Sequence, residues 1–182
     1  MSIWVGKLAL GVNIREYGDG NPGATNVFRA GGKGWGILAL FLDFIKGAIP
    51  VGIANFWLGL DGIVMVAVAL APILGHAYSP FLGGHGGKAL AVTFGIWTGL
   101  SLFMVPILLG VSFAIWLTLL QPEGWAVMMG SLMLLAALLL ISAPTVWIGS
   151  CVGMLLILAL THWSDLQQKI VLRPFAKSTS PS

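Results

Sequence analysis

Long apolar runs with almost no charged residues are the feature that most limits how this chain can fold. Of its 182 residues, 58% are hydrophobic and 8% are charged, whereas about 25% of the residues of a soluble domain carry charge. So few charges cannot cover a surface that faces water. The composition therefore predicts an integral membrane protein. The net charge of +3 is too small to indicate nucleic-acid binding.

Apolar stretches of about the length needed to cross a bilayer recur along the chain. Five of them approach the roughly 20 residues required: 35–60, 62–81, 102–120, 124–142 and 144–162. Residues 3–12 and 87–100 are apolar but shorter. A single helix over 87–120 would be about 50 Å long, against a hydrocarbon core of ~30 Å, so we predict a break at 98–101. The predicted fold is all-α, a polytopic membrane helix bundle of about six to seven membrane helices in one domain, 1–172.

Two polar, glycine-rich segments interrupt the apolar sequence. Residues 18–26 read Gly-Asp-Gly-Asn-Pro-Gly-Ala-Thr-Asn, and residues 83–88 read Gly-Gly-His-Gly-Gly-Lys. Glycines let backbone N–H groups converge into a cradle for phosphate or carboxylate. Asn21, Thr25 and Asn26 add side-chain donors. We therefore favour an anion site here, with a plain re-entrant turn as the alternative.

The second segment does not match a P-loop. Leu82 stands where that motif needs a glycine, and Ala89 stands where a Ser or Thr would bind magnesium. An ATPase is therefore excluded. Lys88 at the start of a helix is still a good phosphate ligand, because the N–H groups of the first turn point toward the loop. The alternative is a lysine that only reaches toward the membrane surface.

The distribution of cations gives the orientation. With a break at 98–101, one side of the membrane holds Arg15, Arg29, Lys33, Lys88, Lys169, Arg173 and Lys177. The opposite loops, around Asp61, 98–101 and 142–144, have no Lys or Arg. Positive residues collect on the cytoplasmic side. Both glycine-rich segments and a disordered tail over 173–182 are therefore expected in the cytoplasm.

A few polar residues lie within or beside the apolar spans. Asp43 and Lys46 are one helical turn apart, so a structural ion pair is favoured over a catalytic one. His76 either packs or contacts substrate. Cys151 cannot form an internal disulfide and is favoured as a packed thiol. No His, Cys or carboxylate cluster has metal-ligand spacing, so no metal or other cofactor is predicted.

Several motifs resemble those of one enzyme family. Residues 13–30, Asn-Ile-Arg-Glu-Tyr-Gly-Asp-Gly-Asn-Pro-Gly-Ala-Thr-Asn-Val-Phe-Arg-Ala, resemble a hallmark of the bacterial acyl-phosphate:glycerol-3-phosphate acyltransferases. So do residues 41–47, Phe-Leu-Asp-Phe-Ile-Lys-Gly, and 74–78, Leu-Gly-His-Ala-Tyr, followed by Gly86-Gly87-Lys88 and Thr93. His162 resembles the first residue of the C-terminal motif. The resemblance covers nearly the whole chain and identifies it as a divergent member.

The resemblance implies an activity and a location. Family members are multi-pass enzymes of the bacterial cytoplasmic (inner) membrane, with an active site that faces the cytoplasm. They transfer a fatty acyl group from acyl phosphate to the 1-hydroxyl of glycerol 3-phosphate, which gives lysophosphatidic acid and phosphate for phospholipid synthesis. The implied partners are those two substrates and membrane lipid, with no metal, nucleotide or nucleic acid. The oligomeric state stays open, with a monomer as one possibility.

The same resemblance, together with the glycine-rich segments, assigns the site residues. The catalytic set is Asp19, Arg29, Lys88 and His162. In it, Arg29 and Lys88 bind phosphate oxygens, and His162 orients the acceptor or assists proton transfer. The substrate-binding set comprises Gly18, Gly20, Asn21, Gly23, Thr25, Asn26, His76, Gly86 and Gly87.

Some positions depart from the family pattern. Asp19 stands where a serine is usual, and Asp165 where an asparagine is usual. A carboxylate repels substrate phosphate unless a cation neutralises it, but it can also accept the hydroxyl proton as a base. Asn13 replaces an aspartate, and Ala89 a glycine. The family's first-helix motif, of Ser-Ile-Pro type, falls before the chain's first residue, and Ser2-Ile3 matches it poorly.

These departures leave two alternatives to the acyltransferase. One is a catalytically impaired relative that binds or passes phosphorylated lipids or small anions. The other is a small anion permease, which inverted repeats would favour. The sequence has no convincing pair of related halves, and this weakens the permease interpretation.

Overall fold

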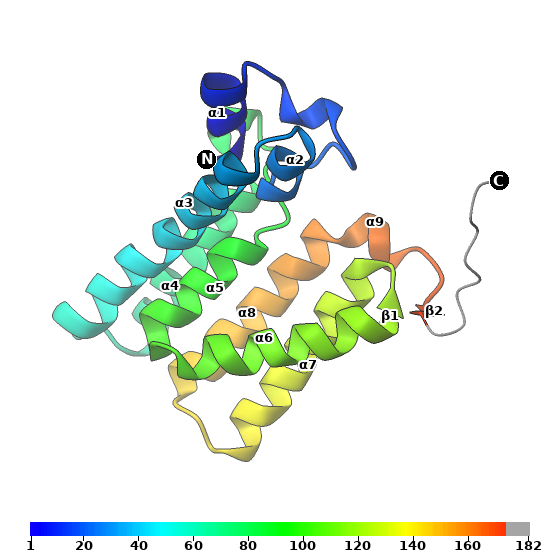
Figure 1. Cartoon of the computed structure of the whole chain (residues 1–182). Coiled ribbons are helices and arrows are strands. Elements are labelled where there is room, and N and C mark those ends of the chain that lie inside the picture. The colour runs from blue at the N-terminus through cyan, green and yellow to red at the C-terminus, as the bar shows by residue number, and fades with distance from the viewer. Residues whose placement is uncertain (174–182) are drawn as a thin grey trace.

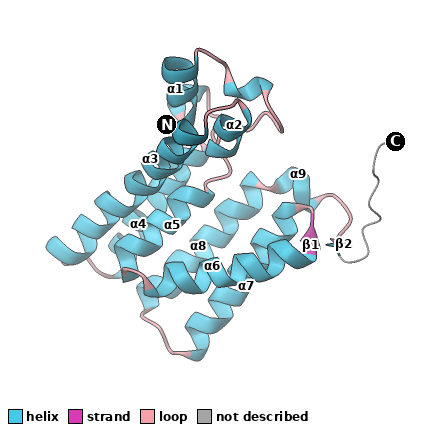
Figure 2. Ribbon diagram, viewed as in Figure 1, coloured by secondary structure: helices cyan, strands magenta, loops and turns pink. Residues whose placement is uncertain are grey.

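The computed structural model describes residues 1–173 and is almost entirely helical (Figures 1 and 2). Its body consists of α3 (Lys33–Gly52), α4 (Gly62–Ala77), α5 (Leu90–Ser101), α6 (Met104–Leu119), α7 (Glu123–Leu140) and α8 (Thr145–Thr161). The shorter helices are α1 (Ser2–Val5), α2 (Ala24–Arg29) and α9 (Trp163–Leu166). Short π-helical or 3₁₀ turns cover Gly6–Leu10, Ile14–Glu16, Ile53–Trp57 and Pro80–Leu82.

The helices have the length and surface of a membrane bundle. Three helical stretches, Lys33–Trp57, Gly62–Leu82 and Glu123–Leu140, are long and apolar enough to cross a bilayer, and α5, α6 and α8 are shorter apolar helices. Large apolar side chains point outward, with Ile63 80% and Leu140 86% exposed. Such a surface is stable against lipid and unstable against water. The predicted all-α membrane bundle is therefore confirmed.

A break between two helices is present, but it lies at 102–103, whereas residues 98–101, where the sequence predicted it, form the last turn of α5. Helix α5 ends at Ser101 and α6 begins at Met104, and between them Leu102 has a φ of 55°. The Ser101 hydroxyl donates to the Trp97 carbonyl over 2.7 Å and accepts the Val105 N–H over 3.2 Å. One side chain thus satisfies backbone groups at the end of α5 and the start of α6.

Glycines bring α3 and α5 into direct backbone contact. A Cβ on Gly95 would overlap the Phe44 carbonyl oxygen, and one on Gly99 would lie 2.7 Å from the Gly52 nitrogen. A Cβ on Gly47 would lie 2.6 Å from the Val92 oxygen. Small residues at such contacts let helices pack closely where lipid supplies no hydrophobic driving force. This contact fixes the helix that carries Asp43 against the helix that follows Lys88.

The other helices pack around this pair. Helix α4 packs on α8, and α6 on α7 (Figure 1). Glycines again mark these contacts, since Gly153 faces Leu70 and Gly130 faces Phe113. The main buried cluster draws its side chains from α4 through α8 and from the end of α3 and the π-helical turn after it, with Val51 and Ala54. A second, smaller cluster attaches the N-terminal segment and α2 to α3 through Ile3, Val5, Ile14, Ala24, Val27 and Ala39.

The end of the described chain returns to the start of α7. Strand β2 (Val171–Leu172) pairs antiparallel with β1 (Leu120–Gln121), and Leu120 lies opposite Leu172. The Arg173 Nε donates to the Leu120 carbonyl over 3.3 Å. The rest of the tail that the sequence predicts as disordered, 174–182, lies outside the described residues.

Candidate functional site

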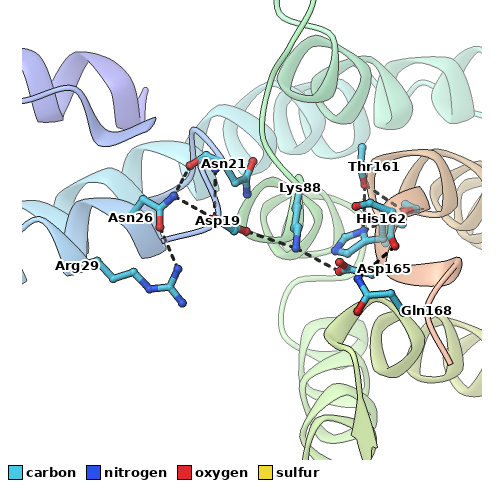
Figure 3. A network of polar contacts seen from close by, with 11 residues as sticks. Asp19, Asn21, Asn26, Arg29, Lys88, Thr161, His162, Asp165 and Gln168 are labelled. Carbon is cyan, nitrogen blue, oxygen red and sulfur yellow. Dashed lines mark hydrogen bonds and ion pairs between the residues drawn. The ribbon is translucent and has the colours of Figure 1, made fainter. Parts of the chain in front are cut away.

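Lys88 connects the two halves of the polar end of the bundle. Its Nζ lies 3.5 Å from Asp19 Oδ2 and 3.2 Å from Asp165 Oδ2. Figure 3 shows the lysine pointing between the two carboxylates, with the first glycine-rich segment on one side and α9 on the other. The side chain of Lys88 is 25% exposed and that of Asp165 15%. The structure thus brings together Lys88 and Asp19, which the sequence predicts as catalytic, and Asp165, which departs from the family pattern.

The first glycine-rich segment is organised around Asp19 and Asn26. Asp19 Oδ1 accepts the Asn21 N–H over 3.2 Å and the Asn26 amide over 3.0 Å. Asn26 is fully buried, and its Oδ1 accepts a hydrogen bond from Arg29 Nη1 over 3.2 Å. Asn26 therefore links the predicted carboxylate to the predicted guanidinium.

These contacts determine the ionisation of Asp19. Partial burial by itself raises the pKa of the carboxyl group, but the hydrogen bonds from Asn21 and Asn26 and the charge of Lys88 outweigh burial. The pKa of Asp19 is therefore held below its ordinary value. The sequence predicted that the Asp19 carboxylate would repel phosphate unless a cation neutralised it. Lys88 is that cation, whereas Arg29 donates a hydrogen bond to Asn26.

Glycine is required at position 18 for two separate reasons. Gly18 has a φ of 58°, a left-handed conformation that other residues rarely adopt. A Cβ there would also overlap the Arg29 guanidinium and lie 2.5 Å from Asn26 Oδ1. This glycine thus makes room for the side chains that bind one another across the loop.

The expected cradle of free backbone N–H groups is not formed by the central residues of this segment. The Gly20 N–H bonds to the Tyr17 oxygen over 3.1 Å, and the Gly23 N–H to the Asn21 oxygen over 2.8 Å. The Asn21 N–H is taken by Asp19. The segment is too tightly turned to leave these donors free, so side chains supply the polar groups that face outward.

The second glycine-rich segment is held by the end of α4. The Gly86 N–H bonds to the Ala77 oxygen over 2.9 Å, and the Gly87 N–H to the His76 oxygen over 3.3 Å. These two glycines therefore position the segment, and their N–H groups are not free for an anion. A Cβ on Gly86 would overlap the His76 oxygen, so glycine is required for this close approach.

The prediction that Lys88 begins a helix is wrong by two residues. Helix α5 begins at Leu90, and Ala89 before it has a φ of 63°. A left-handed alanine costs roughly 1–2 kcal/mol, which explains why a glycine suits this position. The Ala89 carbonyl accepts both the N–H and the hydroxyl of Thr93, over 3.0 and 2.9 Å. Lys88 therefore lies in the strained turn that precedes α5 and is not the first residue of that helix.

His162 directly follows α8 and is buried, with 1% of its surface exposed. Its Nδ1 lies 2.9 Å from the Leu158 carbonyl oxygen, which can only accept, so Nδ1 carries the proton. The His162 carbonyl in turn accepts the Asp165 N–H over 2.9 Å. Figure 3 shows the ring beside Asp165. The predicted histidine therefore lies next to the Lys88 cluster, with Nε2 as its remaining acceptor.

The predicted ion pair of Asp43 and Lys46 is confirmed and is part of a larger cluster. Lys46 Nζ lies 2.6 Å from Asp43 Oδ1 and also contacts His76 Nδ1. Asp43 Oδ2 accepts the Ser2 hydroxyl over 2.9 Å. The sequence predicted the pair from its spacing but not the third partner, His76, which is 30 residues from Lys46. Ser2, which the sequence did not predict as part of a polar cluster, connects α1 to Asp43.

Three neighbouring cavities open at this end of the bundle. A polar cavity of about 200 Å³ is lined by residues of the first glycine-rich segment together with Arg29, Asp43, His76, Lys88 and Glu123. A mostly apolar cavity of about 320 Å³ is lined by Ile3, Trp4, Pro22, Lys46, His76, Phe81 and Leu82. A third, of about 460 Å³, is lined by Asp19, Lys88, Asp165, Lys169 and Arg173 among others.

The cavities show which predicted site residues come together. Asn21, Gly23, Thr25, Asn26, Arg29 and Lys88 line the polar cavity, while His76 lines both the polar and the apolar one. Glu123, at the start of α7, lines two cavities and was missed, because a lone glutamate after Pro122 has no sequence signal. Among residues 1–173, no three His, Cys, Asp or Glu side chains gather where they could hold a metal ion.

Comparison with curated proteins finds relatives with one shared description. The chain is 46% identical over 107 residues to the glycerol-3-phosphate acyltransferase of Aquifex aeolicus, covering 59% of this chain and 54% of that protein. It is 44% identical over 101 residues to glycerol-3-phosphate acyltransferase 1 of Thermotoga maritima, covering 54% and 50%. The chain thus spans about half the length of the curated relatives it matches.

Solved structures and a family model give longer matches. The fold resembles PlsY (YgiH), an integral membrane glycerol 3-phosphate acyltransferase, in its glycerol 3-phosphate form, with a TM-score of 0.78 and 30% identity over 90% of this chain and 82% of that one. The lysophosphatidic acid form of that protein gives a TM-score of 0.74 at 30% identity, covering 91% and 86%. The family model described as "Glycerol-3-phosphate acyltransferase" matches residues 1–171. The chain therefore belongs to the glycerol-3-phosphate acyltransferase family.

Proposed function

We propose that this protein transfers a fatty acyl group from acyl phosphate to the 1-hydroxyl of glycerol 3-phosphate. The observation that carries the proposal is that Lys88, Asn26 and Arg29 line one polar cavity, in a chain that belongs to the glycerol-3-phosphate acyltransferase family. Crystal structures of the relative PlsY are described as glycerol 3-phosphate and lysophosphatidic acid forms, an acceptor and a product of this reaction.

The reaction requires orientation and charge stabilisation more than a protein nucleophile. Acyl phosphate is already an activated anhydride. The acceptor hydroxyl forms the new ester bond to the acyl carbon while the carbon–oxygen bond to phosphate breaks. The hydroxyl proton passes to the departing phosphate, so atoms and charge balance. What the protein supplies is alignment of the two substrates and cations for their phosphate oxygens.

Each candidate residue has a role in this scheme. Lys88 and Arg29 bind phosphate oxygens, because both cations line the polar cavity. Asn21, Thr25 and the loop around Gly18 and Gly20 position the acyl-phosphate head. Asn26 keeps Arg29 in place. His162, with Nε2 unprotonated, accepts a hydrogen bond from the acceptor or assists its proton transfer.

The apolar cavity beside this site suits the acyl tail. Ile3, Trp4, Phe81 and Leu82 line it, and Phe81 is 86% exposed. A donor in the membrane can thus keep its tail among apolar side chains while its head reaches the polar cavity. The cations at this end of the bundle support a site on the cytoplasmic side of the bacterial inner membrane, because positive residues collect on that side.

The test is acyl transfer by the purified protein in detergent. Palmitoyl phosphate and labelled glycerol 3-phosphate should give labelled lysophosphatidic acid, and the Lys88→Ala variant should give far less. A folded wild type that forms no product would leave the second candidate, an impaired relative that only binds phosphorylated lipids or small anions. The pairing of Lys88 with two carboxylates favours that candidate, because both compete with substrate phosphate.

A further inference from the structure

An ion pair inside the bundle holds the side chain of His76 in place. Asp43 of α3 is 2% exposed and binds Lys46 over 2.6 Å. The same Lys46 ammonium contacts Nδ1 of His76 at the end of α4. The His76 side chain is 9% exposed, and Asp43 Oδ1 lies 3.6 Å from its Nδ1. The cluster therefore ties the imidazole of α4 to two charges on α3.

The contact with Lys46 determines which nitrogen of His76 carries the proton. A lysine ammonium has three donors and no acceptor, so Nδ1 must accept a hydrogen bond from it. A neutral imidazole that accepts at Nδ1 carries its proton at Nε2. Nε2 has no hydrogen-bond partner among the described residues, so its N–H remains available.

His76 lies where the two cavities meet. His76 lines both the polar cavity that holds Lys88 and the apolar cavity that holds Lys46. A Cβ on Gly87 would overlap Nε2, so this nitrogen lies directly against the backbone just before Lys88. An acyl phosphate that places its tail in the apolar cavity and its phosphate in the polar cavity has its acyl carbonyl group beside His76.

We propose that His76 is a catalytic residue whose Nε2–H donates a hydrogen bond to the carbonyl oxygen of the acyl phosphate. The inference rests on the proposed acyl transfer and assigns one contact within it. The carbonyl oxygen becomes an oxyanion when the acceptor hydroxyl adds, and the hydrogen bond strengthens as that charge develops. The donor keeps its own proton throughout, so the balance of the reaction is unchanged. Asp43 and Lys46 are positioning residues that fix the tautomer and the ring.

Kinetics of three variants test this role. Since the bond is present with bound substrate but strengthens mainly in the transition state, His76→Ala should lower kcat by about 100- to 1,000-fold and change KM for palmitoyl phosphate less than about threefold. His76→Gln should recover at least about tenfold of that loss, because its amide nitrogen reaches the place of Nε2. His76→Asn, whose amide matches Nδ1 instead, should not. His85→Ala is the matched control, because the exposed ring of His85 contacts only the Gly83 carbonyl oxygen among the described residues.

Two kinetic outcomes overturn the inference. One is a His76→Ala variant with kcat within about fivefold of wild type. The other is equal activity of the Gln and Asn variants, because a merely structural role does not distinguish the two nitrogens.

A spectroscopic measurement keeps the test independent of turnover and of variant folding. The chain has three histidines, so ¹⁵N-imidazole NMR of the wild type in detergent can be assigned with His85→Ala and one further variant. His76 should show a protonated Nε2 and an unprotonated Nδ1, and palmitoyl phosphate should shift the Nε2 signal. A protonated Nδ1, or no shift, contradicts the inference. If both signals behave as stated but no lysophosphatidic acid forms, the proposed activity fails and only the hydrogen bond from His76 to bound palmitoyl phosphate is supported.

Discussion

The Nζ of Lys88 lies 3.2 Å from the Oδ2 of Asp165, 77 positions further along the chain. This contact joins the turn before α5 to α9 and, with Asp19 on the other side, places the cation between two carboxylates. In the proposed reaction, substrate phosphate therefore competes with protein carboxylates for the same ammonium. Much of the predicted behaviour of the site follows from this competition.

Asp165→Asn should strengthen binding of glycerol 3-phosphate. Asparagine keeps an oxygen near Lys88 but removes the competing charge. We expect KM for glycerol 3-phosphate to fall about 3- to 10-fold, up to roughly 1.4 kcal/mol of binding free energy. Steady-state kinetics with palmitoyl phosphate held saturating measure this change. An unchanged or higher KM would show that Asp165 does not compete with substrate.

Lys88→Ala and Arg29→Ala should each impair acyl transfer strongly. Each variant loses a charge-assisted hydrogen bond to phosphate, worth about 1.5–3 kcal/mol, which corresponds to roughly tenfold to a few hundredfold in kcat/KM. Thermal unfolding in detergent serves as the folding control. Near-wild-type turnover by both folded variants would exclude the proposed phosphate site.

Asp19→Ser should leave activity similar to wild type or lower it. Asp19 accepts two hydrogen bonds in its own segment and pairs with Lys88, so its charge is compensated. Serine restores the usual family residue but accepts fewer bonds. The assay is acyl-phosphate-dependent product formation by wild type, Asp19→Ser and the double variant with Asp165→Asn. An inactive wild type that the double variant rescues would identify the aspartates as disabling.

The lowered pKa of Asp19 predicts a pH dependence of stability. The ionised form is favoured in the folded state, so its contribution is present above the unfolded-state pKa, near 3.8, and is lost as the pH falls through the folded-state value. The difference in unfolding temperature between wild type and Asp19→Asn should therefore be constant above about pH 5 and shrink toward pH 3. A difference in unfolding temperature that grows as the pH falls would contradict the lowered pKa of Asp19.

Gly95→Ala should destabilise the bundle. The new methyl group would overlap the Phe44 carbonyl, so α3 and α5 would have to separate, at a cost of about 1–3 kcal/mol. Gly110→Ala in α6 is the matched control, because its Cβ would lie 3.7 Å from Phe94, an ordinary contact. Unfolding curves in detergent distinguish the two. Equal stability of both variants would contradict the close α3–α5 contact.

The sequence predicted much of the fold because apolar length and the cost of charge in lipid are strong, local signals. The existence of a break between the two helices after residue 87 followed from length, although it lies at 102–103, and the Asp43–Lys46 pair followed from helical spacing. The sequence failed where distant segments meet. The Lys88–Asp165 contact and the place of His76 between two cavities depend on how α3, α4 and α9 pack. The left-handed turn at Ala89, which displaces Lys88 from its helix, was also missed, because alanine itself gives no hint of it and only the family's glycine at this position does.

The most direct test of the central proposal is the stoichiometry of the reaction. Purified wild type with palmitoyl phosphate and labelled glycerol 3-phosphate should release one phosphate for each lysophosphatidic acid formed, at a rate that depends on both substrates. The Lys88→Ala variant should lower both products together. Phosphate release without lysophosphatidic acid, or no product from folded wild type, would contradict the proposal that this protein is an acyl-phosphate-dependent acyltransferase.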